Sequence, residues 1–562
     1  MSHEHDLQRR RCLLGLFAAL APLPGAGQAA RACATERVIS DLAAPLTIDT
    51  HTHFFNGSDL QIREFLSQTT VGPESELYSL VKTMAGVLQK LAWATAPGVE
   101  QERAAMAAYR AQLQQCPGRA APWEPASGAA QQGYMLGRAA LQSAAAGPPQ
   151  AGAPAILSAA DGQRDALYAV IDSLPPTLEQ FEGNSRPAIL ETRPTLAGFV
   201  RFLFHHFNFR YVNALDYFQT YSSVSARKID LAVASLVDFD YWLAQGRTAP
   251  TPLADQVELM SELSVLLGGR VHGFVAFCPF RETMTLDSAG VGDALRLVRH
   301  AIERRGLIGV KLYPPMGFAA WGNSGKNVWK GKPTLDRVAW QSGFGARLDR
   351  AMDSLFRYCQ DNDVPIMAHT NESNGPYKEF RALAGSQYWK QAFDRHPGLR
   401  VSFGHFGDSD IEDVQGKRNR PFLDLMTAGA GSSGANAFAD SGFFAGTMID
   451  QGRMRDTLLA LYRSHNGVMR ERLMYGSDWH MILTQQNVRH YLADFIELMK
   501  RVEEEQDTAG ITRPGLPDAF FGRNAAEFLG LRRQRGNRIR LERFYAQNKV
   551  PQPDWMTKVD AA

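Results

Sequence analysis

The chain has 562 residues, of which 45% are hydrophobic and 21% are charged, as in soluble globular proteins that bury one large core or two ordinary ones. Its formal net charge of +2 and the lack of a basic groove motif disfavour a nucleic-acid partner. The cysteines contain no C-x-x-C pair, so neither a zinc ribbon nor a disulfide framework is indicated: Cys12, Cys33, Cys116, Cys278 and Cys359.

Residues 1–32 are typical of an export signal. Arg9-Arg10-Arg11 precedes an apolar run that ends at Leu23 and is too short to span a bilayer, and small residues follow it. The sequence Arg10-Arg11-Cys12-Leu13-Leu14 is similar to the twin-arginine pattern. We expect an exported, periplasmic protein without a stable membrane span in its mature form. An ordinary secretory signal and a disordered cytoplasmic N-terminus are the alternatives.

Short apolar runs recur along the rest of the chain, most of them about 35 to 40 residues apart. This spacing fits one strand, one helix and two loops, and helical spacing of apolar residues in Leu253–Leu267 and Ala294–Arg304 supports it. Eight strands alternating with helices predict an α/β fold, a (β/α)8 TIM barrel built from residues 40–53 and 227–531. The expected strands are Leu46–Ile48, Leu231–Val237, Val271–Phe277, Leu307–Tyr313, Val364–His369, Arg400–His405, Ala435–Ala439 and Leu473–Tyr475.

Two intervals break this rhythm. Residues 54–226 are too long for one crossover and predict a long, mostly helical insertion after strand 1, which we expect to cap the barrel mouth. Helical stretches are expected at Glu74–Ala92, Gln101–Gln115 and Leu196–Phe207, with a mobile excursion over Cys116–Pro154. The aromatic and glycine-rich segment Pro314–Trp329, between strands 4 and 5, is either a substrate-contacting loop or a packed surface loop.

Polar residues follow several of the expected strands. His51 and His53 are two residues apart, so both side chains face the barrel interior and can ligate one metal ion. Lys311, His369, His405 and Asp478 lie at the ends of strands 4, 5, 6 and 8. Imidazole and carboxylate ligands at strand ends predict a hydrolytic metal site, in which Asp478 can also accept a proton.

Other residues are weaker candidates. Arg281, after strand 3, is expected to bind a substrate anion, and the further substrate-binding candidates at the mouth are Tyr313, Asn371, Glu372, Trp479 and His480, for each of which loop packing is the alternative. The adjacent His205 and His206 point about 100° apart on a helix, so we expect cap or interface residues rather than ligands. The arginine-rich C-terminal tail, residues 532–562, is expected to be solvated rather than bound to lipid or a partner.

The chain resembles the amidohydrolase superfamily, within it the amidohydrolase-related (amidohydrolase 2) branch of metal-dependent TIM-barrel hydrolases. The resemblance covers strand 1 and residues 230–531, and the insertion and the tail lie outside it. Its motifs are Ile-Asp-Thr-His51-Thr-His53, Gly-Val-Lys311-Leu-Tyr-Pro, His369, Gly404-His405-Phe-Gly, Asn436-Ala-Phe-Ala-Asp440-Ser, Tyr-Gly-Ser-Asp478-Trp and Gly522-Arg-Asn524-Ala-Ala-Glu-Phe-Leu-Gly-Leu.

This resemblance implies one or two divalent metal ions, with zinc expected. His51, His53 and Asp478 would bind the more buried ion and His369 would be a further ligand. His405 would bind a second ion or act as acid/base. Lys311 would either be carbamylated and bridge two ions or hold a substrate carboxylate.

The implied reaction is attack of metal-activated water on an amide, lactone or other ester bond of a small molecule, with Asp478 moving the proton. A metal-dependent nonoxidative decarboxylase, a lyase of the same superfamily, is the alternative. A non-catalytic binding protein is a third reading, disfavoured because all six candidate residues are present. A homo-oligomer is compatible with the sequence.

Overall fold

The computed structural model describes residues 44–70, 85–86, 89, 92–93, 96–114, 135, 202, 205–408, 418–427, 434–444, 446–485, 488–508 and 515–562. The expected export signal lies outside these residues, as do the Cys116–Pro154 excursion except residue 135 and most of the helices expected at Glu74–Ala92 and Leu196–Phe207. Helix α5 (Val99–Gln114) corresponds to the helix expected at Gln101–Gln115.

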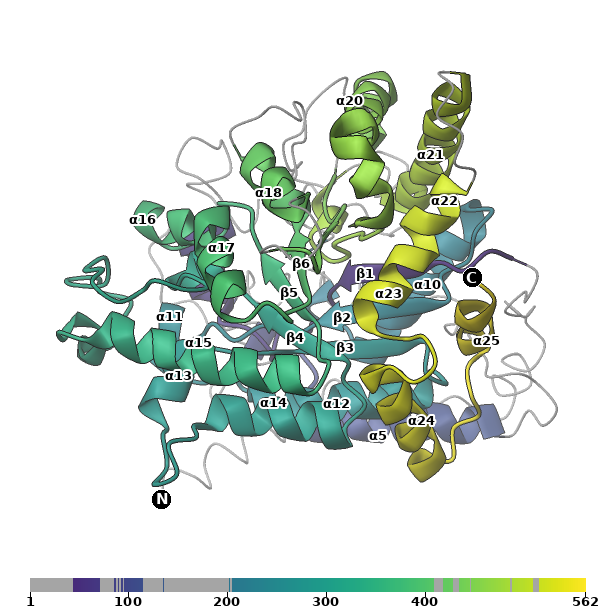
Figure 1. Ribbon diagram of the computed structural model, residues 1–562. Helices are drawn as coiled ribbons and strands as arrows, with labels where there is room; N and C mark the ends of the chain where they lie inside the picture. Colours follow the sequence, from purple (N-terminus) through teal and green to yellow (C-terminus); the bar gives the residue numbers. More distant parts are fainter. Residues whose placement is uncertain are drawn as a thin grey trace, which may run out of the picture.

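Eight parallel strands form one sheet in the order of the sequence, which confirms the expected barrel (Figure 1). Each strand pairs with the next in parallel register, and Thr50 N donates to Tyr475 O at 3.1 Å, which links the first strand to the residue after the last. The strands are β1 (Ile48–Thr52), β2 (Leu231–Ser235), β3 (Val271–Ala276), β4 (Gly309–Leu312), β5 (Ile366–His369), β6 (Val401–Gly404), β7 (Ala437–Asp440) and β8 (Leu473–Met474).

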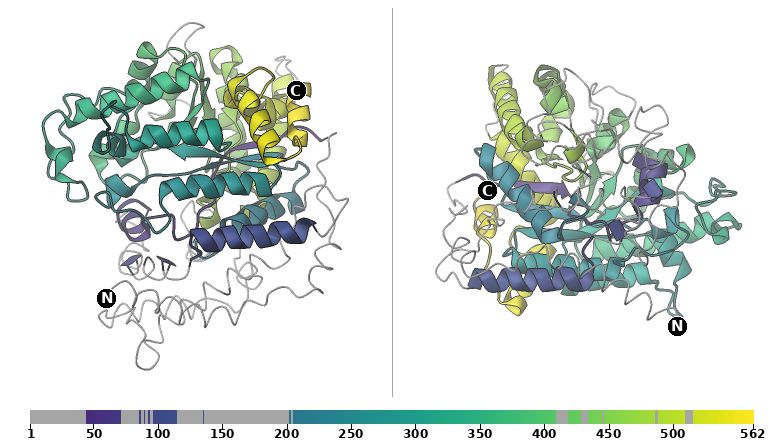
Figure 2. Two further views of the ribbon diagram at one scale, coloured as in Figure 1. Left: turned by 90° about the horizontal axis from the view of Figure 1, so that it is seen from below. Right: turned by 180° about the vertical axis from the view of Figure 1, so that it is seen from behind.

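All residues of these strands are buried, as expected for parallel strands that are covered on both faces. Helices cover the outside, and α12 and α14 correspond to the two that the apolar spacing predicts (Figures 1 and 2). The helices between β2 and β7 are α11 (Asp240–Leu243), α12 (Leu253–Leu266), α13 (Pro279–Met284), α14 (Asp293–Arg304), α15 (Phe344–Asp361), α16 (Lys378–Arg381), α17 (Ser386–Arg395) and α18 (Asn419–Met426). Those after β7 are α19 (Gly446–Ile449), α20 (Gln451–Arg463), α21 (Tyr491–Thr508), α22 (Leu516–Asp518) and α23 (Asn524–Leu529).

The insertion contributes α3 (Ile62–Phe65), α5 and α10 (Arg210–Val224) to the described residues. Helix α5 runs beside α12 on the flank of the barrel (Figure 2). A buried ion-pair cluster joins the parts of this region, because Arg210 donates to both carboxylate oxygens of Asp59, at 2.9 and 3.0 Å, and its backbone N–H donates to Glu102. The cluster therefore holds parts of the insertion to one another, while α5 contacts the barrel helix α12.

The C-terminal segment is not a solvated tail, so that expectation is wrong. Helices α24 (Gly536–Asn548) and α25 (Asp554–Ala561) pack against the strands with α23, and apolar side chains such as Phe544, Trp555 and Val559 join a core with Leu231 and Phe274 (Figure 1). Two arginines of this segment pair with carboxylates, Arg535 with Asp363 and Glu527 and Arg538 with Asp560.

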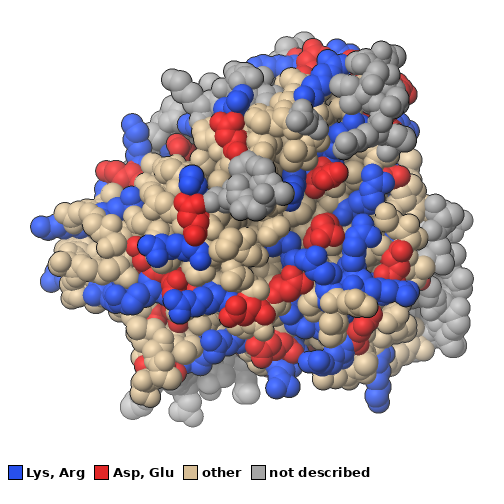
Figure 3. All heavy atoms as spheres, viewed as in Figure 1, with Lys and Arg blue, Asp and Glu red and all other residues tan. Residues whose placement is uncertain are grey.

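Acidic and basic side chains are interspersed over the face of the molecule that Figure 3 shows. Among the described residues, no helix combines the length and the apolar character that a membrane crossing requires.

Candidate metal centre

The six candidate residues of the polar series lie at the carboxyl ends of the barrel strands, where TIM-barrel sites are built. All six are buried. His51 lies within β1, Lys311 within β4 and His369 at the end of β5, whereas His53, His405 and Asp478 follow β1, β6 and β8.

The carboxylate of Asp440, the last residue of β7, orients the ring of His51. Its Nδ1 lies 2.9 Å from Asp440 Oδ1, and burial, followed by the charge of Lys311, lowers the pKa of His51 to about 4. The imidazole is thus neutral near pH 7, with Nδ1–H donated to Asp440 and the lone pair of Nε2 turned to the site. A Cβ at Gly442 would lie 2.5 Å from His51 Nδ1, so only glycine leaves room for this ring.

His53 and Asp478 complete a group of three. His53 Nδ1 lies 2.8 Å from the carbonyl oxygen of Ser235, which can only accept, so Nδ1 carries the proton and Nε2 the lone pair. His53 Nε2 and His51 Nε2 lie 3.4 and 3.7 Å from Asp478 Oδ1. Burial alone would raise the pKa of Asp478, but hydrogen bonding to His53 and the neighbouring histidines lower it overall, so the carboxylate is ionised.

These three residues fit a divalent metal ion. Their ligand atoms lie within 4.8 Å of one another, and no other His, Cys, Asp or Glu group of this kind occurs in the described part of the chain. Ligands about 2.1 Å from a tetrahedral ion are about 3.4 Å apart, close to the separations from Asp478. Both imidazoles also donate their remote N–H to an oxygen acceptor, as metal-binding histidines do.

The backbone at two of the strand ends is in the left-handed region. Asp478 has φ of 53° and His405 has φ of 64°, values that non-glycine residues seldom adopt. Hydrogen bonds hold both conformations, because Asp478 N donates to His51 O at 2.7 Å and His405 N donates to Asp440 Oδ1 at 3.2 Å. The same contacts that bend the chain therefore aim the side chains at the centre.

His369 and His405 form a pair next to the group of three. His405 Nδ1 lies 2.8 Å from the carbonyl oxygen of Gly442, and its Nε2 lies 3.1 Å from His369 Nδ1. The ring of His405 is 4.7 Å from that of His51, centroid to centroid. Tyr313 stacks on His369 at 4.1 Å and accepts a hydrogen bond from Asn374.

Lys311 reaches the same centre from β4. Its Nζ lies 3.3 Å from His51 Nε2 and 2.7 Å from the sulfur of Met367, and burial lowers its pKa to about 8. The amine is therefore more easily neutral than that of a solvated lysine. Carbamylation of Lys311 and its role in metal binding stay predictions.

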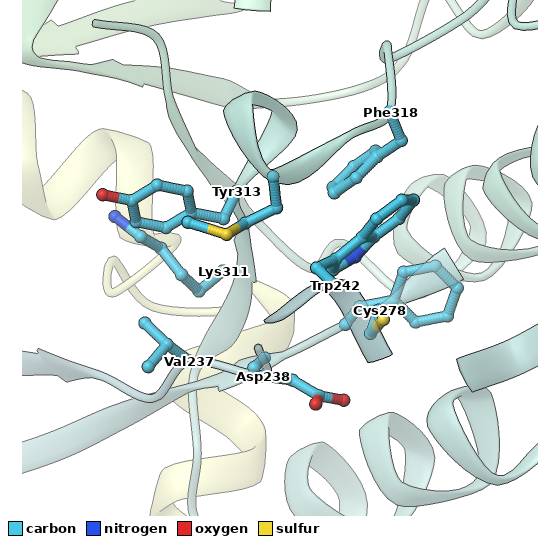
Figure 4. A pocket seen from close by; sticks show the side chains of 10 residues that line it. Val237, Asp238, Trp242, Cys278, Lys311, Tyr313 and Phe318 are labelled. Carbon is cyan, nitrogen blue, oxygen red and sulfur yellow. The ribbon is translucent and has the colours of Figure 1, made fainter. Parts of the chain in front are cut away.

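A small pocket opens beside Lys311, and Figure 4 shows its walls. Tyr313, Met316 and Phe318 come from the end of β4 and the loop after it, whereas Val237, Asp238 and Trp242 follow β2. The first part of the loop Pro314–Trp329 lines this pocket, and Trp329 is buried, with Nε1 donating to Gly317 O at 2.6 Å. Contact of the loop with a substrate stays a prediction.

The remaining substrate-binding candidates lie in different surroundings. The guanidinium of Arg281 donates to Asp238 at 2.6 and 2.8 Å and to Asp240 at 2.8 Å. Trp479 is buried against Tyr217 of the insertion, and Asn371 is half-buried after β5. Their roles toward a substrate stay predictions.

Parts of the insertion lie beside β8's polar end. The rings of His205 and His206 lie 6.1 and 4.6 Å from that of His480, and His206 Nδ1 is 2.9 Å from Phe202 O. Neither histidine belongs to the metal-ligand group. This matches the expectation that they are cap or interface residues, although the capping role of 54–226 as a whole stays a prediction.

Three residues of the site were not identified as site residues from sequence. Asp440 orients His51, and Asp49 accepts from the backbone N–H groups of His51 and Ser477 at 3.1 and 3.0 Å. Tyr217, from α10, donates to Asp49 at 2.8 Å. Asp440 follows an apolar strand like the other candidates and could have been found by that signal, whereas nothing in the sequence pairs Tyr217 with Asp49.

Comparison with known proteins gives one family. Residues 269–531 match the family model described as amidohydrolase, and no curated protein matches the chain.

Three solved structures are similar at a distance. A TIM-barrel protein from Bordetella bronchiseptica is 15% identical, with 57% of this chain and 79% of that chain covered and a TM-score of 0.32. A 5-carboxyvanillate decarboxylase from Sphingomonas paucimobilis is 14% identical, with 53% and 78% covered and a TM-score of 0.31. A 4-oxalomesaconate hydratase from Rhodopseudomonas palustris is 15% identical, with 57% and 80% covered and a TM-score of 0.35.

TM-scores this low do not support the fold assignment, which rests on the strand order and register given above. The matched region holds β3 to β8 and with them Lys311, His369, His405 and Asp478. The match of residues 269–531 to the amidohydrolase family model thus agrees with the resemblance of the motifs in that region.

Proposed function

We propose that this chain is a metal-dependent hydrolase that cleaves an amide, lactone or other ester bond of a small molecule. The observation that carries the proposal is the group of His51 Nε2, His53 Nε2 and Asp478 Oδ1, with the two imidazole lone pairs fixed toward one point at the barrel mouth. The amidohydrolase match supports an enzyme of this type, in a superfamily that includes hydrolases and decarboxylases.

A bound divalent ion supplies Lewis acidity that polarises a carbonyl group and acidifies water. The residues around the ion have separate roles. Asp478 is ionised, so its carboxylate can accept the proton of the attacking water and pass it to the leaving group. His405 Nε2, whose ring is held through Nδ1 by Gly442 O, faces the centre as a second acid/base group.

Lys311 is a further basic group beside the group of three. Its Nζ is 3.3 Å from His51 Nε2, and most of the side chains that line the pocket beside it are apolar. That pocket, between Tyr313, Phe318 and Trp242, has room for about one atom of the size of water, so it fits only a small part of a substrate whose scissile bond lies at the group of three.

The proposal is tested with the zinc-loaded full chain and a panel of an aryl ester, an aryl lactone, an anilide and 2,6-dihydroxybenzoate. We expect hydrolysis of at least one of the first three, and we expect Asp478→Asn to reduce kcat at least a hundredfold. Asp349→Asn is the matched control, since Asp349 is also a buried acceptor, in α15, and does not belong to the metal-ligand group.

Release of carbon dioxide without hydrolysis would replace the proposal by the decarboxylase alternative. Equal rates of hydrolysis by wild type and Asp478→Asn would show that Asp478 takes no part in the reaction.

We also propose that the protein is exported to the periplasm and loses its first residues there. The twin-arginine-like sequence Arg10-Arg11-Cys12-Leu13-Leu14 supports this. N-terminal sequencing of the protein from a periplasmic fraction should start close to Ala32, and it should start there no longer when Arg10 and Arg11 are both replaced by lysine. An intact N-terminus on cytoplasmic protein would contradict export.

A further inference from the structure

Helix α10 belongs to the insertion, and one face of it lies against the polar end of β1. Arg210, Asn213 and Tyr217 are three and four residues apart, so their side chains leave the helix on the same side. Arg210 Nη1 donates to Phe54 O at 3.2 Å, and Asn213 Nδ2 donates to Phe55 O at 2.9 Å. This face therefore holds the backbone that directly follows the two histidines of strand 1.

Tyr217 extends the contact to the carboxylate of Asp49. Its side chain is fully buried, and its hydroxyl donates to Asp49 Oδ2 at 2.8 Å. Burial and the charge of Asp49 raise the pKa of Tyr217, so the hydroxyl keeps the proton that it donates. Asp49 Oδ1 in turn accepts from the backbone N–H groups of His51 and Ser477, at 3.1 and 3.0 Å. One carboxylate thus joins the metal-ligand end of β1 to the segment after β8.

The ring of Tyr217 contacts the chain neighbours of the other two ligands. Its centroid lies 5.5 Å from that of Phe54 and 5.3 Å from that of Trp479. Phe54 follows His53 in the chain, and Trp479 follows Asp478. Because all three rings are buried in a close-packed interior, a shift of the Tyr217 ring would displace both ligand segments. A single side chain of the insertion is therefore linked to the segments of all three metal-ligand residues.

We propose that Tyr217 is a positioning residue of the metal centre and that it acts through Asp49. It holds the ends of β1 and β8 in the relative position that brings the three ligand side chains together. Its effect on a metal rests on the proposed function, whereas the link between the two strand ends does not. The insertion then contributes a residue to the centre, although it lies outside the region that matches the family model.

The first test is hydrogen exchange followed by mass spectrometry, on the full chain as purified and after removal of metal by a chelator. Tyr217→Phe removes only the hydroxyl. Loss of its hydrogen bond should speed exchange about tenfold in the peptides that contain residues 47–53 and 473–480. Peptides from β3 to β6 should exchange at wild-type rates.

Tyr221→Phe is the matched control for this substitution. Tyr221 lies one turn further along α10, is equally buried and contacts the same Trp479 ring, at 5.6 Å. Its hydroxyl has no hydrogen-bond partner in the described part of the chain. We therefore expect this variant to exchange like the wild type at both strand ends.

The second test is competitive titration of Zn²⁺, together with the absorption spectrum of the Co²⁺-substituted chain. Tyr217→Phe should bind Zn²⁺ about tenfold more weakly and shift the Co²⁺ bands, since it disturbs a group that orients the ligands. Tyr221→Phe should stay within about threefold of the wild type and keep its spectrum. A hydroxyl that only stabilised the fold would change neither the affinity nor the spectrum of the folded chain.

Wild-type exchange at both strand ends in Tyr217→Phe would overturn the proposal, as would equal changes in the Tyr217 and Tyr221 variants. Faster exchange with unchanged Zn²⁺ affinity and Co²⁺ spectrum would overturn the role at the metal centre. A wild type that binds no metal would overturn the proposed function, whereas faster exchange in Tyr217→Phe would still show that Tyr217 holds the strand ends.

Discussion

Asp440→Asn is the substitution that tests how the barrel prepares His51 for metal. Asp440 Oδ1 accepts from His51 Nδ1 at 2.9 Å, from Gly442 N at 3.0 Å and from His405 N at 3.2 Å. Asparagine keeps this oxygen, and its new amide hydrogen can point to Ser402 Oγ, which lies 3.3 Å from Oδ2. The fold should therefore survive, whereas the negative charge behind the imidazole is lost.

The expected effect is a weaker metal site. Replacing the group that orients a metal-binding histidine typically reduces metal affinity 10- to 100-fold, which is about 1.4 to 2.8 kcal/mol. Asp440→Ala should behave differently, because it leaves the N–H groups of His51, Gly442 and His405 without an acceptor. At about 1 kcal/mol for each buried donor, the free energy of unfolding should fall by about 3 kcal/mol.

The assay is competitive titration of Zn²⁺ against a chelator, together with urea unfolding of the metal-free chain. Asp349→Asn serves as the control, since Asp349 accepts three hydrogen bonds from Asn323 and Ser324 and has no contact with the centre. We expect its zinc affinity to stay within about threefold of wild type. Equal zinc affinity in wild type and Asp440→Asn would refute the role of Asp440.

Three further predictions concern the surroundings of the site. Gly317→Ala should lower the free energy of unfolding by about 1 to 3 kcal/mol, because φ is 148° and the new Cβ would lie 2.5 Å from the Trp242 ring. The control Gly331→Ala, where φ is 76° and the space is open, should lower it by about 1 kcal/mol. Equal losses of the two variants in urea unfolding would contradict the packing argument. Burial raises the pKa of Glu102 from 4.5 to about 7, so between these pH values the folded chain holds a proton that the unfolded chain has released. The free energy of unfolding should therefore fall by about 3 kcal/mol as pH rises from about 4.5 to 7. Glu102→Gln should lack this part of the pH dependence, and an unchanged pH profile in that variant would refute the assignment. Deletion of residues 532–562 should expose the core around Phe274, and circular dichroism should then show no cooperative unfolding transition. A truncated chain as stable as the full chain would contradict the packing of α24 and α25.

The barrel could be predicted from sequence because its strands are buried on both faces and are therefore mostly apolar. Strand 1 was the exception, since the pattern placed it at Leu46–Ile48, whereas β1 runs from Ile48 to Thr52. Of its polar residues, His51 belongs to the candidate metal centre, and a functional strand end looks like a loop when hydropathy alone is considered.

The candidate metal ligands could be named from the sequence, whereas some of the residues that hold them in place could not. His51, His53 and Asp478 share a visible position, the end of an apolar run. The contact between Tyr217 and Asp49 joins residues 168 apart through the insertion, and no local pattern encodes it. The same limit explains the C-terminal tail: its arginines look solvated in sequence, but Arg535 and Arg538 find Asp363 and Asp560 only once the chain has folded.

The most direct test of the central claim is the metal content of the purified full chain and of three single variants, His51→Asn, His53→Asn and Asp478→Asn. Elemental analysis after dialysis should find at least one equivalent of a divalent ion in the wild type. Each variant should retain less than about a tenth of it while its circular dichroism spectrum stays that of the wild type. A wild type without metal after loading, or variants that hold as much metal as the wild type, would contradict the assignment of these three residues as the metal centre.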